Sequence, residues 1–266
     1  MTSNSSRLGF LGTGAIAEAM VHGLVGHAGY DGPIVLSPRS RERSSRLAGQ
    51  YETVVVAESN QSLVDACGTV VVAVLPPNTQ EILEALEWRT DQNLLSLAGG
   101  RTTAELKRWT RGPEHVLRAI PMPPVERGVG PIPLYPRHDD VEALLNRVGT
   151  VIPLDKEQHF DVFSASSATM ATFFEMQGTV ARWTAAQGVD AQLSTTYTTT
   201  LLDALATMSS DLDAETLQGL SEECLTSGGL NERVLRGLQK DAWFERLEEG
   251  LQDIADLLAS RQPERD

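Results

Sequence analysis

The stretch Gly9-Phe10-Leu11-Gly12-Thr13-Gly14-Ala15-Ile16-Ala17 decides the fold of this chain. It places glycines at positions 12 and 14 and an alanine at position 17, which is the spacing of a dinucleotide-binding turn. In such a turn Gly12 bends the chain out of a strand, Gly14 lets the backbone approach a pyrophosphate, and Ala17 lets the next helix pack closely. The first N–H groups of that helix bind the anion at the positive end of the helix dipole. We therefore assign residues 12–16 to a nucleotide cofactor.

Short β-branched runs alternate with helical patterns through the first half of the chain. Strands are expected at residues 7–12, 33–37, 53–57, 69–74, 93–96, 115–120, 132–135 and 151–154. Helices are expected at residues 15–26, 40–50, 59–66, 79–88, 102–109 and 141–147. Continuous apolar runs suit parallel strands buried on both faces, so the pattern predicts a doubly wound α/β sheet of the Rossmann type. A glycine turn without a ligand is the alternative, but the turn opens a βαβ unit, which favours the cofactor.

The character of the chain changes after residue 154, where strand patterns disappear. Helices are expected at residues 160–188, 191–209, 214–225, 230–240 and 242–260. We therefore predict two domains, a cofactor-binding domain at residues 1–154 and an all-helical substrate and dimerisation domain at residues 155–266. Residues 195–200 are all Thr except Tyr197, although β-branched side chains lower helix propensity. Burial in a contact between two subunits would explain this run.

Charge and composition limit the partners of the chain. Its formal net charge is −14, and residues 153–266 carry 8 Lys and Arg against 20 Asp and Glu. An acidic surface repels phosphate backbones, so nucleic acid is not an expected partner. The two cysteines are far apart, the first residues are polar, and no apolar run has the length of a membrane span. These features predict a cytoplasmic protein with reduced thiols and a polar tail at residues 261–266.

The second expected strand indicates which nicotinamide nucleotide is bound. NAD enzymes usually carry an acidic residue at its end to hold the ribose hydroxyls. Here Ser37 occupies that place, and Arg39 and Arg41 follow it. Guanidinium groups bind a 2′-phosphate strongly, so we predict NADP(H) in preference to NAD(H). Arg43 and Arg46 are expected on a solvated helix face.

Six segments in order resemble the pyrroline-5-carboxylate reductase family over nearly the whole chain. They are FLGTGAIAEAMVHGL at residues 10–24, VVVAVLPPNTQEIL at 70–83, LLSLAGG at 94–100, RAIPMPPVERGVG at 118–130, DVFSASSATMATFF at 161–174 and LTSGGLNERVL at 225–235. The resemblance implies a Rossmann domain, a helical dimerisation domain, and hydride transfer from NADPH to the C=N carbon of a cyclic imino acid. In the family this reaction converts 1-pyrroline-5-carboxylate to proline.

The resemblance also implies site residues. It adds Val74, Leu75, Pro76, Ala98 and Gly99 to the cofactor site. It implies substrate contacts from Met122, Ser167, Gly228, Gly229 and Leu230. It also implies catalytic roles for Asn231 and Thr169, with Ser166 or Ser167 as the alternative hydroxyl in a shifted alignment. An amide can donate a hydrogen bond in the place of the family's threonine at position 231. The interlocked helices of the family imply a homodimer or a larger assembly of identical chains.

Departures from the family pattern concentrate at the substrate end, where polar side chains are replaced. The altered positions are Leu75, Pro77, Met122, Pro123, Ser227, Leu230 and Asn231. They leave open a second hypothesis, a catalytically silent NADP(H)-binding sensor or scaffold. A β-hydroxyacid dehydrogenase would need a catalytic lysine after the cofactor domain, and neither Lys156 nor Lys240 lies in such a motif. The five histidines have no metal-ligand spacing, so no metal site is predicted.

Overall fold

A computed structural model of the chain describes residues 7–260, so the polar start and the polar tail lie outside the described residues. The chain divides into two compact units, which we call the N-terminal unit, ending at Phe160, and the helical unit, beginning at Asp161. The boundary expected at residue 154 lies slightly earlier in the chain. Residues 155–160 belong to the N-terminal unit because Glu157 and Phe160 both contact Arg118 of that unit.

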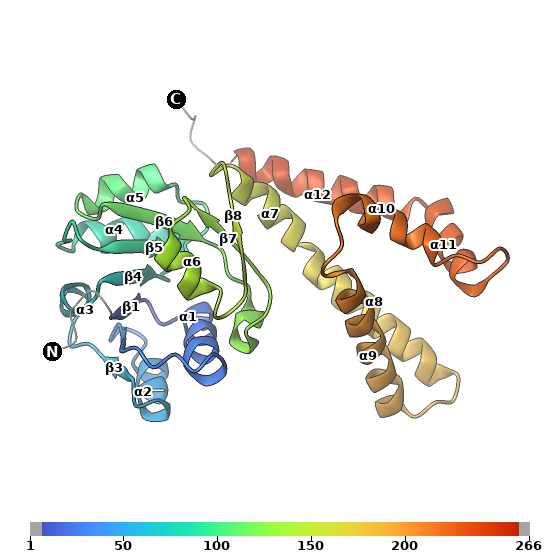
Figure 1. Cartoon of the computed structure of the whole chain (residues 1–266), viewed down its shortest axis with the longest axis horizontal. Coiled ribbons are helices and arrows are strands. Elements are labelled where there is room, and N and C mark those ends of the chain that lie inside the picture. Colours follow the sequence, from blue (N-terminus) through green and yellow to red (C-terminus); the bar gives the residue numbers. More distant parts are fainter. Residues whose placement is uncertain (1–6, 261–266) are drawn as a thin grey trace. The chain divides into compact units, whose positions relative to one another are not determined.

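The N-terminal unit is built on one eight-stranded sheet (Figure 1). Its strands are β1 (Leu8–Leu11), β2 (Ile34–Leu36), β3 (Val54–Val56), β4 (Thr69–Val72), β5 (Asn93–Ser96), β6 (His115–Ala119), β7 (Pro131–Tyr135) and β8 (Thr150–Pro153). The strand order is β3-β2-β1-β4-β5-β6-β7-β8, and every neighbouring pair is parallel except β6 with β7. The predicted doubly wound sheet is therefore confirmed.

Two layers of helices cover the two faces of this sheet. The layers are identified by two apolar clusters, because successive strand residues point to opposite faces. Phe10 of β1 belongs to the cluster with α1 (Ala15–Val21), α2 (Arg41–Gln50), α6 (Asp139–Leu145) and the 3-10 turn η4 (Pro123–Arg127). Leu11 of β1 belongs to the cluster with α3 (Asn60–Ala66), α4 (Thr79–Glu84) and α5 (Thr103–Thr110). A π-helical segment, η2 (His22–His27), continues α1 where a single α-helix was expected.

Six helices lie within the described residues from His159 onward, and the first of them begins two residues before the helical unit. They are α7 (His159–Ser167), α8 (Thr169–Ala186), α9 (Ala191–Ser209), α10 (Ala214–Glu223), α11 (Leu230–Lys240) and α12 (Trp243–Ser260). The prediction of one helix over residues 160–188 is wrong, because the chain breaks at Ala168. The hydroxyls of Ser167 and Thr169 each donate to a backbone carbonyl three residues earlier, at 2.8 Å, and such bonds compete with the helical pattern. In residues 7–260 no helix has the length and apolarity of a membrane span.

Burial within the helical unit is sparse. Between residues 161 and 260 the only buried side chains are those of Ala165, Ser194 and Thr198. Large apolar side chains such as Trp183 and Tyr197 are 64% and 66% exposed. Six helices with so few buried residues do not enclose a hydrophobic core of their own.

Candidate functional site

The glycine turn lies at the carboxyl edge of the sheet, where several loops meet. Leu11 of β1 is in register with Val72 of β4, and Val72 is in register with Ser96 of β5. The loops that follow these strands carry the predicted cofactor residues 12–16, 74–76 and 98–99. The fold therefore brings three separate parts of the predicted cofactor site to one edge, which is where open α/β sheets bind their ligands.

Gly12 and Gly14 have different structural reasons to be glycine. Gly12 has φ +94°, and a Cβ there would lie 2.8 Å from the carbonyl oxygen of Ala73. Gly14 is the N-cap of α1 in an extended conformation, and the nearest atom to an added Cβ is 3.8 Å away. No side chain caps α1, so its first backbone N–H groups have no partner within the helix. The turn thus leaves an unobstructed backbone surface that fits a pyrophosphate.

Buried hydroxyl groups fix the shape of this turn. The N–H of Gly12 donates to Oγ of Ser37 over 2.9 Å. Oγ of Ser44 lies 3.0 Å from Oγ1 of Thr13 and 2.9 Å from the carbonyl oxygen of Ser37. All three hydroxyl side chains are buried, so those of Thr13 and Ser37 stabilise the turn and its neighbouring strand end. Sequence reasoning missed Ser44, whose signal is a hydroxyl residue at a buried position of a charged helix.

Arg43 also supports the turn. Its Nη1 donates to the carbonyl oxygen of Thr13 over 3.1 Å, and its Nε lies 2.6 Å from Glu18 of α1. Arg46 forms a second ion pair with Glu18. Arg46 is exposed, as expected for a solvated helix face, and Arg43 is half-buried. The sequence did not reveal that both pair with Glu18, because Glu18 lies on a different helix.

Arg39 and Arg41 lie beside the turn and are exposed. Among residues 7–260 neither has an ion-pair partner. Arg41 lines a shallow hollow of about 330 Å³ together with Ser40 and residues of α2. The arrangement leaves two guanidinium groups available for an anion at the end of β2.

The loops after β4 and β5 are tied to each other by Arg101. Its guanidinium donates to the carbonyl oxygen of Pro76 over 3.1 Å. In the same loops Leu75 is 71% exposed, and Ala98 is buried with its N–H donating to Oγ of Ser96 over 3.2 Å. Leu75 therefore presents an apolar side chain at the carboxyl edge. Sequence reasoning missed Arg101, which follows directly after the Gly99-Gly100 turn.

A buried ion pair closes the end of the N-terminal unit. Nη1 of Arg118 lies 2.7 Å from Oε1 of Glu157, and the Arg118 guanidinium lies 4.5 Å from the ring centroid of Phe160. The Glu157 carboxylate also accepts from the backbone N–H of Thr103 at 2.7 Å and from its hydroxyl at 3.0 Å. Arg118 is only 5% exposed. This network holds the segment after β8 against β6 and the first turn of α5.

Met122 begins the turn that follows β6. It is half-buried and is the N-cap of the 3-10 turn η4, whose Val125 packs in the same cluster as α1. η4 also packs closely against Gly23 of η2, because a Cβ at Gly23 would overlap the carbonyl oxygen of Val125. The turn after Met122 is thus packed against α1 and η2.

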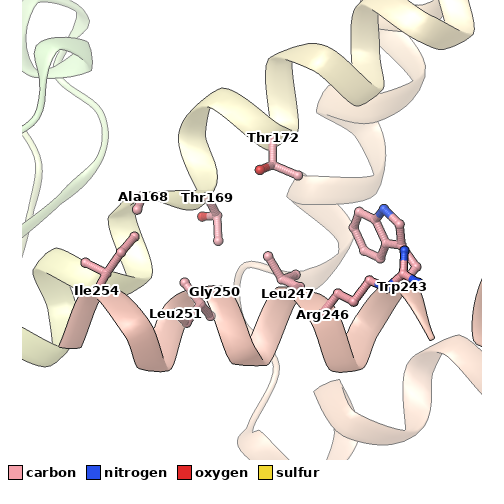
Figure 2. Close-up of a pocket in the computed structure, with 9 residues that line it drawn as sticks. All are labelled: Ala168, Thr169, Thr172, Trp243, Arg246, Leu247, Gly250, Leu251 and Ile254. Carbon is pink, nitrogen blue, oxygen red and sulfur yellow. The ribbon is translucent and has the colours of Figure 1, made fainter. Parts of the chain in front are cut away.

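Thr169 lines a hollow of about 390 Å³ within the helical unit (Figure 2). Its walls are Ala168, Thr169 and Thr172 on one side and Trp243, Arg246, Leu247, Gly250, Leu251 and Ile254 of α12 on the other. The Thr169 hydroxyl donates to the carbonyl oxygen of Ser166, which leaves its lone pairs able to accept a hydrogen bond. Ser167 uses its hydroxyl on the carbonyl oxygen of Ser164 and does not line this hollow.

The predicted substrate residues Gly228 and Gly229 lie in a turn before α11, and their N–H groups bond within the chain. The N–H of Gly228 donates to Oε2 of Glu232 over 2.6 Å, and the N–H of Gly229 donates to the carbonyl oxygen of Thr226 over 2.7 Å. The side-chain amide of Asn231 donates to the carbonyl oxygen of Cys224 over 3.1 Å. Leu230 is 84% exposed.

Thr169 and Asn231 do not meet within one chain. The hollow beside Thr169 contains no residue of 226–231. Figure 1 shows α11 at the end of the helical unit that is remote from α7. Thr169 is the first residue of α8, which begins directly after α7. Within the described residues of one chain, the structure therefore does not bring the two predicted catalytic residues together.

The two cysteines are free and differ in environment. Burial raises the pKa of the Cys67 thiol to about 12, so it stays protonated at neutral pH and is a poor nucleophile. Cys224 is exposed. Within the described range no group of three or more His, Cys, Asp or Glu residues is arranged to hold a metal ion.

One protein-family model matches part of the N-terminal unit. The family described as "NADP oxidoreductase coenzyme F420-dependent" matches residues 7–100. These residues run from β1 through the glycine turn to the loop after β5. The match therefore covers all three loops that meet at the carboxyl edge of the sheet.

Individual relatives extend the similarity into the helical unit. The pyrroline-5-carboxylate reductase of Pseudomonas aeruginosa is 27% identical over 180 residues, which are 64% of this chain and 66% of that protein. The pyrroline-5-carboxylate reductase of Mycobacterium tuberculosis is 25% identical over 267 residues, with 93% and 84% covered. The crystal structure of Plasmodium falciparum pyrroline carboxylate reductase with NADP bound superposes with a TM-score of 0.81 at 19% identity, covering 98% of this chain and 99% of that chain. At that identity the structural likeness is one of fold.

Proposed function

We propose that this divergent member of the pyrroline-5-carboxylate reductase family uses NADPH to reduce the C=N bond of a cyclic imine. The reaction class follows from the family, whose members are NAD(P)H-dependent reductases acting on C=N bonds. Among cyclic imines, an imino acid of the 1-pyrroline-5-carboxylate type is the compound to test first. The observation that carries the proposal is the glycine turn, in which Gly12 approaches Ala73 closely and the start of α1 is open.

In this reaction the residues of the chain bind the cofactor and form hydrogen bonds to the substrate. NADPH, when bound, supplies a hydride to the imine carbon, and the C=N π electrons become the lone pair of a nitrogen that already carries its proton. The backbone N–H groups at the start of α1 hold the pyrophosphate, and Leu75 covers part of the carboxyl edge. Thr169 accepts a hydrogen bond from the protonated imine nitrogen, and the second amide hydrogen of Asn231 donates to the substrate.

Arg39 and Arg41 account for a preference for NADPH over NADH. Both are exposed at the end of β2, where the adenosine ribose lies in dinucleotide folds, and both lack a carboxylate partner among the described residues. The R39A/R41A variant should weaken NADPH binding roughly ten- to a hundredfold, the value of charged hydrogen bonds to a phosphate, and leave NADH binding nearly unchanged. The exposed Arg108 of α5 provides the control, since R108A should alter neither nucleotide. Equal weakening of NADPH and NADH would defeat the assignment.

The helical unit forms the contact of a homodimer in this proposal. Its support is the large exposed apolar surface of α8 and α9, which includes Phe173, Phe174 and Trp183. Soluble monomers rarely expose many large apolar side chains on neighbouring helices. A second copy would also bring an Asn231 to each Thr169.

The experiment that tests the function follows NADPH oxidation with 1-pyrroline-5-carboxylate and with carboxylate-free 1-pyrroline. Turnover of either imine supports the proposal. Binding of NADPH without turnover of any cyclic imine would contradict it and favour a nucleotide-binding sensor or scaffold.

A further inference from the structure

Glu18 places a largely buried carboxylate beside the glycine turn. It lies in the first turn of α1, and its side chain is only 17% exposed. Its Oε2 lies 2.6 Å from Nε of Arg43, and its Oε1 pairs with Nη2 of Arg46. Both oxygens are therefore occupied by arginines of α2. Since water and salt screen a partly buried pair less than an exposed one, the carboxylate holds these guanidinium groups in place.

Arg43 connects this carboxylate to the turn. Its Nη1 donates to the carbonyl oxygen of Thr13 over 3.1 Å, while its Nε faces Glu18. Thr13 lies between Gly12 and Gly14, whose backbone the pyrophosphate approaches in the proposed function. NADPH and NADH share this pyrophosphate, so Arg43 in this position serves both nucleotides alike.

The two arginines paired with Glu18 also line the hollow beside the end of β2. Its lining residues are Ser40, Arg41, Glu42, Arg43 and Arg46. Arg41 has no ion-pair partner among residues 7–260, whereas Arg43 and Arg46 share the Glu18 carboxylate. An anion in this hollow therefore meets one uncompensated guanidinium and two that a carboxylate already neutralises in part. Without the charge of Glu18, all three could turn towards the anion.

We propose that Glu18 is a positioning residue that sets the specificity for the nicotinamide nucleotide. It keeps Arg43 on the turn that both nucleotides use, and it keeps Arg43 and Arg46 away from the 2′-phosphate. Recognition of the 2′-phosphate is thereby left to Arg39 and Arg41, and the preference for NADPH is smaller than four free arginines would give. The inference rests on the proposed function, which assigns the 2′-phosphate to this end of β2.

The test measures the dissociation constants of NADPH and NADH for the full chain by calorimetry and compares their ratio. E18Q keeps the size of the side chain and removes its charge. NADH should bind severalfold more weakly to E18Q because Arg43 leaves the turn, whereas the freed arginines should offset this loss for NADPH. The preference for NADPH should therefore rise about tenfold, the value of one charged hydrogen bond to a phosphate. E18Q/R43A/R46A lacks the freed arginines and should return to about the wild-type preference.

Glu42 is the matched control for the charge of the hollow. It lines the same hollow and has no ion-pair partner in the described part of the chain. E42Q removes the same charge without releasing an arginine, so it should raise the preference less than about threefold. R39A/R41A leaves the pairs of Glu18 intact and should bind NADPH and NADH about equally. This variant tests the proposal independently of whether E18Q folds.

Three results would overturn the inference. If E18Q weakens both nucleotides alike and leaves the preference unchanged, Glu18 only supports the turn. An effect of E42Q as large as that of E18Q would assign the preference to the charge of the hollow and not to the released arginines. A strong NADPH preference that persists in R39A/R41A would show that Arg43 or Arg46 contacts the phosphate in spite of Glu18. In each case the reduction of a C=N bond still stands, whereas a wild-type chain that binds neither nucleotide would remove the proposed function as well.

Discussion

Large apolar side chains are treated differently in the two units of this molecule. In the N-terminal unit Phe10 and Leu94 are completely buried. In the helical unit Phe174, Trp183 and Tyr197 are each more than half exposed. The sheet and its two helical layers bury their large apolar side chains within one unit. The helical unit leaves its large apolar side chains exposed, which is unusual for a surface that nothing covers. The comparison teaches that the N-terminal unit encloses a hydrophobic core of its own, whereas the helical unit leaves most of its large apolar side chains exposed.

Ion pairs in the two units also differ in burial. Removal of the buried pair should have the largest effect on the free energy of unfolding. Glu157 pairs with the buried Arg118 at 2.7 Å, and Glu175 pairs with the exposed Arg182 at 2.6 Å. E157A should lower the free energy of unfolding of the N-terminal unit by about 3 kcal/mol, because it leaves a buried guanidinium unpaired. Urea unfolding followed by the fluorescence of Trp88 and Trp109 in a W183F/W243F background measures this change.

The exposed pair provides the control for this prediction. E175A should cause no measurable change, because water screens the pair. Arg182 holds the pKa of the Glu175 carboxyl below its ordinary value, but the group is fully exposed. An E157A variant as stable as the wild type would show that the network around Arg118 does not stabilise the N-terminal unit.

The exposed apolar surface of the helical unit should be covered in solution. We expect a species of twice the chain mass of 28.8 kDa, measured by light scattering. W183E should raise the dimer dissociation constant about a hundredfold, since a charge replaces a large apolar side chain. V55E changes an exposed apolar side chain of β3 and should have no effect. A wild-type chain that stays monomeric at all concentrations would contradict the proposed dimer.

Arg43 should affect both nicotinamide nucleotides equally. It supports the turn through the carbonyl oxygen of Thr13 and is half-exposed. R43A should weaken NADPH and NADH by about tenfold each, because the turn shape serves the pyrophosphate that both share. R46A removes only a pair with Glu18 and should have a smaller effect. A selective loss of NADPH in R43A would instead make Arg43 a ligand of the 2′-phosphate.

The two cysteines report on solvent accessibility, one in each unit. Their modification is the smallest perturbation of the folded protein that we consider. At pH 8 iodoacetamide should modify the exposed Cys224 quickly and Cys67 only after unfolding. Burial raises the pKa of Cys67 from 9.0 to about 12, so the folded state holds the thiol proton more tightly. Its contribution to stability is therefore full below pH 9 and is lost as the pH rises from 9 towards 12. Rapid modification of Cys67 in the folded protein, detected by mass spectrometry, would contradict its burial.

Much of the N-terminal unit could be predicted because its signals are local. Short apolar strand patterns that alternate with helix patterns predict a doubly wound sheet. They did not predict that β7 pairs with β6 in the antiparallel direction. Gly12 could be assigned from spacing alone, and its φ of +94° gives the physical reason. The pairs Arg43 with Glu18 and Arg118 with Glu157 could not be found this way, since each joins residues far apart in the chain.

The helical unit was harder to predict for a related reason. Its helices were found, but the break at Ala168 depends on hydroxyl-to-carbonyl bonds that no apolar pattern reports. The engagement of Gly228 by Glu232 likewise depends on which of several donors a flexible side chain reaches. An exposed apolar face and a buried one also have the same sequence pattern when the covering surface belongs to another chain.

The central claim, that a dinucleotide pyrophosphate rests on the backbone between β1 and α1, is tested most directly by Gly14→Val. Gly14 has an ordinary φ of −82° and open space around an added Cβ, so the variant should fold and unfold thermally like the wild type. Its side chain would fill the approach to the N–H groups of α1. Calorimetric titration should show one NADPH per wild-type chain and at least about a hundredfold weaker binding to G14V. An unchanged NADPH affinity in G14V, or no NADPH binding by the wild-type chain, would contradict the account.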